Sequence, residues 1–239
     1  MKFDWKDKKI TVLTGAGFSR ASGIHTFRGD EESLWNKYNP AELATPHAFA
    51  QNPKLVWEWY KWRINIVLGS QPNQAHLTLA KLENKNAHIS IITQNVDDLH
   101  ERAGSNNVIH VHGEILKARC VKCISKFTWT AKLINEYQSI PQCKECGSYF
   151  RPDVVWFGES LDGQILQQCY TLLNETDTLI VAGTSAVIYP VAEFPFLVKR
   201  SNPLSEIYEF NIEKTPISKI ATETIIGPVE ETLIQFFQL

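Results

Sequence analysis

Five short apolar runs constrain the fold of this chain more than any other feature. Each is rich in β-branched residues and is followed by glycine or polar residues. The five occupy residues 8–17, 88–93, 108–112, 178–184 and 206–211. Such runs are typical of parallel strands buried on both faces of a sheet. Helical patterns lie between several of them, over residues 76–84, 97–104, 162–175 and 230–239. Strands that alternate with helices predict an α/β fold built on an open sheet.

Two stretches interrupt this alternation. Residues 30–75 contain aromatic helical patterns and no clear strand, whereas residues 117–150 contain four of the five cysteines. The chain has 239 residues, a length that suits one large domain or two small ones. Its N-terminus lacks the apolar core of a signal peptide, and no apolar run reaches membrane length. The sequence therefore predicts a cytoplasmic protein.

The four clustered cysteines have the spacing of a metal site. Cys120, Cys123, Cys143 and Cys146 form the pattern C-x2-C-x19-C-x2-C. Two such pairs can surround one tetrahedral ion with four thiolates, and Zn²⁺ fits this geometry best. Because the protein fills all four positions, we expect one structural zinc that stabilises a small module. Cys169 lies in a helical pattern and is expected to be a buried small hydrophobic residue.

Polar and small residues follow several predicted strands, at the sheet edge where ligands bind in open α/β folds. The glycine turn GAGFSRASG would let backbone amides approach a pyrophosphate, although Arg20 occupies the third glycine position of the dinucleotide fingerprint. Gln94, Asn95 and Asp97 follow the second strand, where Asn95 or Asp97 could also start a helix as its N-cap. The motifs GTS and FNIE, after the last two strands, suit contacts to a ribose or a phosphate.

His112 is the candidate for a general base. It lies in the motif HVHGE at the end of the third predicted strand, and its ordinary pKa lies near neutrality. Residues two apart in a strand share a face, so His110 and His112 are expected to point the same way. A structural histidine with satisfied hydrogen bonds is an equally good interpretation of this motif alone.

The helical stretch EWYKWR places Tyr60 and Arg63 on one face, since they are three residues apart. One interpretation is an arginine whose stem lies along the edge of a core while its charge reaches water. The other is a pocket that binds a negative charge. The neighbouring Trp57, Trp59 and Trp62 are expected to be packing residues.

In sequence order, these motifs resemble those of the sirtuins. The matching segments are GAGFSRASGIHTFRG, TQNVDDLH, HVHGE, the four cysteines, RPDVVWFGE, GTS and FNIE, from residue 12 to about residue 230. The chain is most similar to the compact bacterial class III sirtuins. The resemblance implies a Rossmann-like parallel sheet domain with a smaller inserted domain, which consists of a helical module and the four-cysteine zinc module.

The resemblance also implies how a single catalytic domain, residues 1–239, is divided. The large Rossmann-like part is expected at about residues 1–29, 76–116 and 151–239. The small part is expected at about residues 30–75, the helical insert, and 117–150, the zinc insert.

Matched motif by motif, the resemblance assigns a set of site residues. Those expected to bind NAD are Gly15, Ala16, Gly17, Ser19, Phe27, Arg28, Gln94, Asn95, Val96, Asp97, Gly183, Thr184, Ser185, Asn211, Glu213 and Val229. Those expected to contact the peptide or the acyl group are Ala44, Tyr60, Arg63, Val154, Val155, Trp156, Phe157, Gly158 and Glu159. The catalytic residues are expected to be His112, Asn95 and Asp97.

The implied reaction is NAD-dependent removal of acyl groups from protein lysine. The acyl oxygen attacks the ribose carbon that carries nicotinamide, and His112 takes a proton from a ribose hydroxyl. The products are free lysine, nicotinamide and O-acyl-ADP-ribose. In class III sirtuins a Tyr-x-x-Arg pair lines the acyl pocket, so Tyr60 and Arg63 imply a preference for succinyl and malonyl groups, with acetyl also removed. Asp153, often histidine in the family, and Arg20, usually a small residue, depart from the pattern.

Other functions fit parts of the sequence. An NAD hydrolase or ADP-ribosyltransferase could use the same fold, although the zinc module and VVWFGE favour peptide binding. A net charge of −2 provides no basic field for a nucleic-acid-binding zinc ribbon. A dehydrogenase is disfavoured by Arg20, and a non-enzymatic zinc module by the polar strand ends. The expected partners are acylated lysines of proteins, without nucleic acid or membrane, and the oligomeric state stays open, a monomer being compatible with the sequence.

Overall fold

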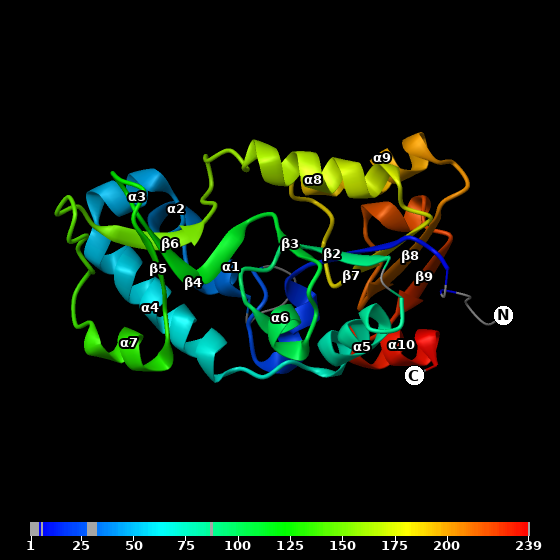
Figure 1. Ribbon diagram of the computed structural model, residues 1–239, viewed down its shortest axis with the longest axis horizontal. Helices are drawn as coiled ribbons and strands as arrows, with labels where there is room; N and C mark the ends of the chain where they lie inside the picture. Colours follow the sequence, from blue (N-terminus) through cyan, green and yellow to red (C-terminus); the bar gives the residue numbers. More distant parts are fainter. Residues whose placement is uncertain (1–4, 6, 28–32, 87, 239) are drawn as a thin grey trace.

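The main sheet is built from six parallel strands. In the computed structural model, which describes residues 5, 7–27, 33–86 and 88–238, their order is β3-β2-β1-β7-β8-β9 (Figure 1). The strands are β1 Ile10–Thr14, β2 Ile89–Thr93, β3 Val108–His110, β7 Thr178–Ala182, β8 Glu206–Asn211 and β9 Glu223–Ile226. The chain extends from β1 to β3 on one side and from β7 to β9 on the other. An open sheet binds ligands at such a switch point, beyond the carboxyl ends of its strands.

Helices cover both faces of this sheet (Figure 1). On one face lie α8 Gly163–Asn174 and α9 Phe194–Ser201, and on the other α5 Gln74–Glu83 and α10 Val229–Phe237. Neighbouring strand residues point to opposite faces, so Val12 packs in one core and Leu13 in the other. Cys169 is fully buried in the core under α8, as expected. The predicted Rossmann-like parallel sheet is confirmed.

Two features of the sheet differ from the sequence prediction. The strand expected over 108–112 ends at His110, because the chain turns at residues 111–112 and enters the next strand through Gly113, whose φ is +77°. The edge strand β9 was not predicted, since its half-exposed sequence ETII has no run of buried apolar residues.

A second part of the chain forms an antiparallel sheet of order β5-β4-β6 and a group of helices, on the left of Figure 1. Its strands are β4 Gly113–Cys120, β5 Lys126–Thr128 and β6 Phe150–Val154. Its helices are α1 Leu34–Lys37, α2 Pro40–Leu43, α3 Pro46–Gln51, α4 Pro53–Gly69 and α7 Ala131–Glu136. The sequence indicated the helices within residues 30–75 but neither α7 nor the three strands. The predicted domain boundaries stay a prediction.

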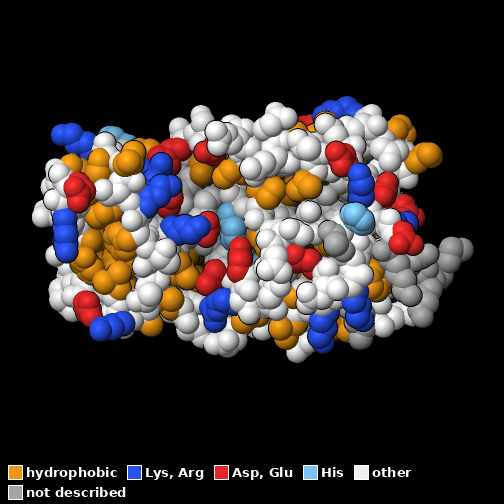
Figure 2. Space-filling model, viewed as in Figure 1, with side chains coloured by type: hydrophobic (Ala, Val, Ile, Leu, Met, Phe, Trp, Pro, Cys, Tyr) orange, Lys and Arg blue, Asp and Glu red, His pale blue; other side chains and the backbone are white. Residues whose placement is uncertain are grey.

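Smaller elements lie in the connections. They are α6 Leu99–Ala103 and the 3-10 helices η1 Ala16–Ser22, η2 Val191–Glu193 and η3 Pro216–Lys219. Charged side chains of both signs are interspersed over the face seen in Figure 2, in agreement with the small net charge. Within the described residues, no helix combines the length and the apolarity needed to cross a bilayer.

The long helix α4 buries one face in the core of the second part and exposes the other. The Asn52 side chain accepts a hydrogen bond from the Leu55 N–H (3.1 Å) and so caps the start of α4. Trp57 and Trp59 are buried in the helix, as expected. Trp62 is 38% exposed, so the expectation of a packing residue is only partly right there.

Candidate active site

A cavity of about 960 Å³ lies between the carboxyl ends of the parallel strands and the second part of the chain. Its walls on the sheet side come from the segments that follow β1, β2, β7 and β8. On the opposite side α4 and the segment after β6 contribute side chains. The cavity therefore includes the switch point between β1 and β7, where an open sheet is expected to bind a ligand.

Most of the predicted site residues line this cavity. They are Gly15, Ala16, Gly17, Phe27, Ala44, Tyr60, Arg63, Gln94, Asn95, Val96, His112, Val154, Val155, Trp156, Phe157, Gly158, Glu159, Gly183, Thr184, Ser185, Asn211, Glu213 and Val229. Ser19 and Asp97 are buried next to the lining residue Asn95, in one hydrogen-bonded group with it. Arg28 lies outside the described residues.

The cavity also has lining residues that were not assigned to the site from the sequence motifs. They are Arg20, Ala21, Thr26, Trp59, Ser160, Leu161, Leu166, Ile188, Tyr189, Pro190, Ile212, Pro228 and Glu230. Many of these are apolar residues in loops, and their place depends on how each loop folds back over the sheet. Several of them adjoin residues that the motifs did assign, such as Ile212 between Asn211 and Glu213, Thr26 before Phe27 and Trp59 before Tyr60.

The glycine turn after β1 is shaped by contact with the turn after β7. A Cβ atom at Gly15 would lie 2.6 Å from Thr184 Cβ, and one at Gly17 would lie 2.9 Å from Gly183 O. The Gly15 and Gly17 amides donate to the carbonyls of Ala182 and Gly183, at 3.1 and 2.8 Å. These two amides are thus engaged by the neighbouring turn. That the glycine turn as a whole approaches a pyrophosphate stays a prediction. The glycines are needed because the two turns touch.

Ser19, Asn95 and Asp97 form one buried hydrogen-bonded group. The Asn95 amide donates to Ser19 Oγ (3.0 Å), and the Ser19 hydroxyl donates to Asp97 Oδ2 (3.0 Å). Burial raises the pKa of the Asp97 carboxyl, against the lowering effect of hydrogen bonds from Leu99 N–H and Ser19. Asp97 also accepts the Leu99 N–H at the start of α6, so its cap-like role and its site role coexist.

His110 and His112 have opposite electrostatic settings. Both ring nitrogens of His110 face acceptors, Asn95 O at 3.1 Å and Glu101 Oε1 at 2.7 Å, so its ring donates twice as an imidazolium. Burial alone would lower the pKa of His110, but the hydrogen bond and charge of Glu101 outweigh it, and the pKa is raised.

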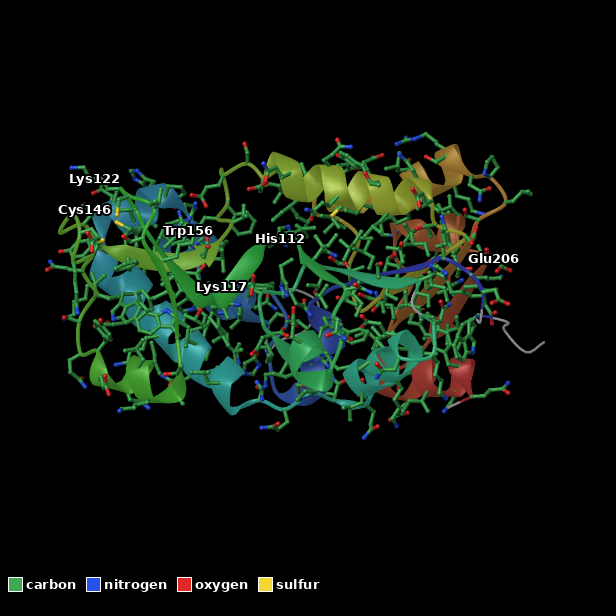
Figure 3. All side chains as sticks on the ribbon, viewed as in Figure 1. His112, Lys117, Lys122, Cys146, Trp156 and Glu206 are labelled. Carbon is green, nitrogen blue, oxygen red and sulfur yellow. The ribbon has the colours of Figure 1, made fainter. Side chains whose placement is uncertain are left out.

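His112 is held as a neutral imidazole. Its Nδ1–H donates to Gln94 O at 3.0 Å, which leaves Nε2 unprotonated in the neutral ring. Burial lowers the pKa of His112, and this hydrogen bond opposes only part of the shift. His112 lines the cavity at the junction of the two sheets, as Figure 3 shows.

Tyr60 and Arg63 line the cavity from helix α4. Arg63 is only 8% exposed, and its guanidinium carbon lies 4.9 Å from the ring centres of Phe27 and Trp59. Burial lowers the pKa of Arg63, against the opposing influence of Tyr60 and Asp97. An arginine that extends to water would be exposed, so the structure contradicts that interpretation.

The segment after β6 is fixed by its own backbone and by one carboxylate. The Val155 N–H donates to His112 O and the Phe157 N–H to Ala44 O, both at 2.9 Å. Glu159 accepts from the Arg151 guanidinium at 2.6 and 2.9 Å and from the Trp156 N–H at 2.8 Å. Glu159 therefore holds this segment in place, and its carboxylate is already engaged.

Asp153, which departs from the resemblance, is also paired. It accepts a hydrogen bond from Lys126 (2.8 Å) and lies 3.4 Å from Arg119 Nε. Both partners belong to the second sheet, so the carboxylate joins β6 to β4 and β5.

The four cysteines are brought together at the outer end of the second part, as the position of Cys146 in Figure 3 shows. Their sulfur atoms all lie within 4.8 Å of one another. Cys120 and Cys146 are 3.4 Å apart, and Cys123 is 3.5 and 3.6 Å from Cys143 and Cys146. Four sulfurs around a tetrahedral zinc with ~2.3 Å bonds are roughly 3.8 Å apart. The cluster suits one structural zinc.

Known proteins resemble this chain over nearly its whole length. The Sir2 family model matches residues 15–190. The NAD-dependent protein deacylase of Pyrococcus abyssi (strain GE5 / Orsay) is 46% identical over 229 residues, 95% of this chain and 90% of that protein. The NAD-dependent protein deacylase of Aquifex aeolicus (strain VF5) is 50% identical over 213 residues, 89% of this chain and 87% of that protein.

Solved structures agree. A Sir2 homologue in complex with NAD superposes with a TM-score of 0.87 at 44% identity, over 98% of this chain and 90% of that one. A mutant Sir2 homologue in complex with ADP-ribose gives a TM-score of 0.92 at 44% identity, over 98% and 92% of the two chains. The resemblance found in the sequence motifs is confirmed, and the chain belongs to the Sir2 family.

Proposed function

We propose that this protein is an NAD-dependent protein lysine deacylase that prefers the acidic succinyl and malonyl groups and also removes acetyl. The observation that carries the proposal is one cavity lined both by the buried Arg63 and by the glycine turns of the parallel sheet. The name of the relatives, NAD-dependent protein deacylase, supports the reaction type. The products would be free lysine, nicotinamide and O-acyl-ADP-ribose.

The sheet side of the cavity would hold NAD. Asn211 donates to Thr184 O (2.8 Å), and Gln94 donates to Thr184 Oγ1 (2.8 Å), so the turns after β2, β7 and β8 form one connected wall. The amide of Ala16 has no acceptor among the described residues and is available to a phosphate. When bound, NAD supplies the ribose carbon that accepts the acyl oxygen, with nicotinamide as leaving group.

Three further side chains, those of Asn95, His112 and Phe27, would lie near the ribose of nicotinamide. Asn95 lines the cavity, and Ser19 and Asp97 fix its amide from behind. His112 offers an unprotonated Nε2 and would take a proton from a ribose hydroxyl, because its Nδ1–H is committed to Gln94 O. Phe27, which lines the cavity beside Arg63, would keep water from the reaction centre.

The other end of the cavity would bind the acyl group. A succinyl or malonyl group ends in a carboxylate, which the Arg63 guanidinium and the Tyr60 hydroxyl can bind. A charged hydrogen bond of this kind contributes about 1.5–3 kcal/mol. With an acetyl group Arg63 has no carboxylate to bind, which predicts selectivity without loss of deacetylation.

The peptide that carries the lysine would lie along the segment 154–159. The segment is held rigidly by Arg151 and Glu159, so its remaining backbone groups are presented in a fixed geometry. Backbone pairing gives affinity with little demand on the peptide sequence. A cytoplasmic location, the absence of nucleic-acid and membrane partners and a monomeric state stay predictions.

The test is a panel of acetyl-, succinyl- and malonyl-lysine peptides with NAD, read by mass spectrometry. We expect higher kcat/KM for the acidic groups, and in Arg63→Met a loss of this preference by about 10- to 100-fold with deacetylation retained. An unchanged preference in Arg63→Met would contradict the acyl assignment. NAD incubated without peptide tests the alternative, an NAD hydrolase or ADP-ribosyltransferase, because a hydrolase would release nicotinamide without any acyl-lysine.

A further inference from the structure

The hydroxyl of Tyr60 is held by one side chain of the peptide-binding segment. The indole Nε1–H of Trp156 donates to Tyr60 Oη at 2.8 Å, and both residues are almost fully buried, at 3% and 2% exposure. The two residues are 96 positions apart in the sequence. This hydrogen bond therefore joins the acyl end of the cavity to the segment beside which the peptide would lie.

The chemistry of the two groups fixes the direction of every hydrogen bond at this point. An indole N–H can only donate, whereas a phenol can donate once and accept at two lone pairs. Trp156 thus occupies an acceptor position of Tyr60, and the Tyr60 proton has to point elsewhere. Arg63, whose guanidinium carbon lies 5.6 Å from the Tyr60 ring centre, can also only donate, so neither of these two neighbours accepts that proton. A buried donor without an acceptor is costly, and Tyr60 lines the cavity.

We propose that Trp156 is a positioning residue for acyl selectivity, because its indole N–H makes the Tyr60 hydroxyl a donor that serves the carboxylate of an acidic acyl group. This inference rests on the proposed function. A carboxylate only accepts hydrogen bonds, so a hydroxyl that is fixed as a donor suits it. An acetyl group ends in a methyl group, which can accept nothing from Tyr60.

The surroundings of Trp156 fit this role. The Arg151 guanidinium carbon lies 3.3 Å from the ring centre of Trp156, and Phe49 packs on its ring at 5.4 Å. The Trp156 backbone N–H is bound by Glu159 at 2.8 Å. The indole is thus restrained from several sides, so its N–H keeps one direction. Burial also raises the pKa of Tyr60 above its ordinary value of 10, which keeps the phenol protonated.

The direct test is Trp156→Phe, which removes the N–H and keeps an aromatic ring. We expect the ratio of kcat/KM for succinyl over acetyl peptide to fall by roughly 3- to 10-fold, the effect of about one neutral hydrogen bond. The fall should come from the succinyl peptide, with KM for NAD unchanged. If the smaller phenylalanine disturbs folding, Trp156 can be replaced by benzothienylalanine, which has sulfur in place of N–H at the same ring size. The same fall in the ratio is expected for that variant.

Trp129→Phe is the matched control. Trp129 is 2% exposed in the same core, and its Nε1 has no hydrogen-bond partner among the described residues. Its replacement removes an indole N–H that donates to none of the described residues, so the succinyl-to-acetyl ratio should equal that of the unmodified protein. A ratio that falls equally in both variants would overturn the proposal, since packing alone would then explain it.

A double-mutant cycle with Tyr60→Phe separates positioning from packing. If Trp156 acts through the Tyr60 hydroxyl, Trp156→Phe should change the ratio in the unmodified protein and leave it unchanged when Tyr60→Phe is already present. Additive effects would overturn the proposal. The proposed acyl preference has its own test: it is contradicted if Arg63→Met leaves the succinyl-to-acetyl ratio unchanged. If Arg63→Met lowers this ratio but Trp156→Phe does not, only the role of Trp156 is rejected.

Discussion

His110 and His112 are two residues apart, yet the fold gives them opposite protonation states. His110 lies between a carbonyl and a carboxylate, and its pKa is raised, whereas His112 has one carbonyl partner and a lowered pKa. The turn that follows His110 takes His112 out of the strand. Strand alternation would have placed both side chains on one face, so the sequence could not separate a structural histidine from a base.

Replacement of His112 by alanine should remove most turnover. We expect kcat to fall by roughly 10²- to 10⁴-fold, the usual contribution of a general base, while the melting temperature and the zinc content stay close to those of the unmodified protein. The base acts in its neutral form and its pKa is lowered by burial. The rate of the unmodified protein should therefore hold through neutrality and fall only below the ordinary histidine pKa of 6.5.

The control for this variant is His47→Ala, because His47 is an exposed histidine of α3 outside the cavity lining. It should keep full activity and the same pH profile. Normal turnover in His112→Ala would refute the assignment. So would a rate in this variant that falls at low pH in the same way as in the unmodified protein.

At the scale of elements, the turns after β1 and β7 explain the cofactor side of the cavity. Gly183 has a φ of +63°, and a Cβ atom there would lie 2.4 Å from Phe18 N. The turn that begins at Gly15 and the turn at Gly183 therefore fit together as backbone against backbone. From the sequence, the glycines indicated a phosphate-binding loop, and the structure shows a packing requirement between two loops 168 positions apart, from residue 15 to residue 183.

Gly183→Ala should damage the nucleotide side of the cavity. Positive φ and the close contact should together lower the free energy of unfolding by about 1–3 kcal/mol, and KM for NAD should rise. Thermal denaturation and NAD titration measure the two effects. Gly163→Ala is the control, because a Cβ at that first residue of α8 meets no atom within 4 Å. Equal stability of the two variants would show that the loop contact is unimportant.

At the scale of the whole molecule, the packing has separate centres. One core contains Tyr60 and Trp156 together with Cys120 and Cys143, whereas the parallel sheet has its own two cores. The cavity wall that contains Tyr60 and the cysteine cluster thus share one packed unit. The turns that would hold NAD belong mainly to the strands of the other unit.

Removal of zinc should therefore affect the two halves of the cavity unequally. After treatment with a chelator we expect deacylation to be lost, because the core around Tyr60 loosens with the cysteine cluster. ADP-ribose binding, measured by calorimetry, should persist within a few-fold. Full deacylation by protein shown by metal analysis to be free of zinc would contradict a structural role for the metal.

Much of this arrangement follows from the sequence. β-branched runs ending in polar residues predicted the parallel strands β1, β2, β3, β7 and β8, because burial on both faces requires continuous apolar residues. The cysteine spacing predicted the metal cluster, since paired ligands at short separation have few other uses. The strands β4, β5, β6 and β9 were missed because none contains a continuous apolar run. The strands β5 and β9 are short and half exposed, whereas charged residues such as Lys117 and Asp153 interrupt β4 and β6.

By itself, the sequence determined the kinds of chemistry present: a glycine turn, amides and carboxylates at strand ends, a histidine near neutrality, four thiolates and a Tyr-x-x-Arg pair. Only the tertiary structure decided their states. Arg63 is buried among rings, Glu159 is engaged by Arg151, and Trp156 donates to Tyr60. Such states depend on burial and on partners far apart in the chain, which a local pattern cannot contain because folding alone brings those residues into contact.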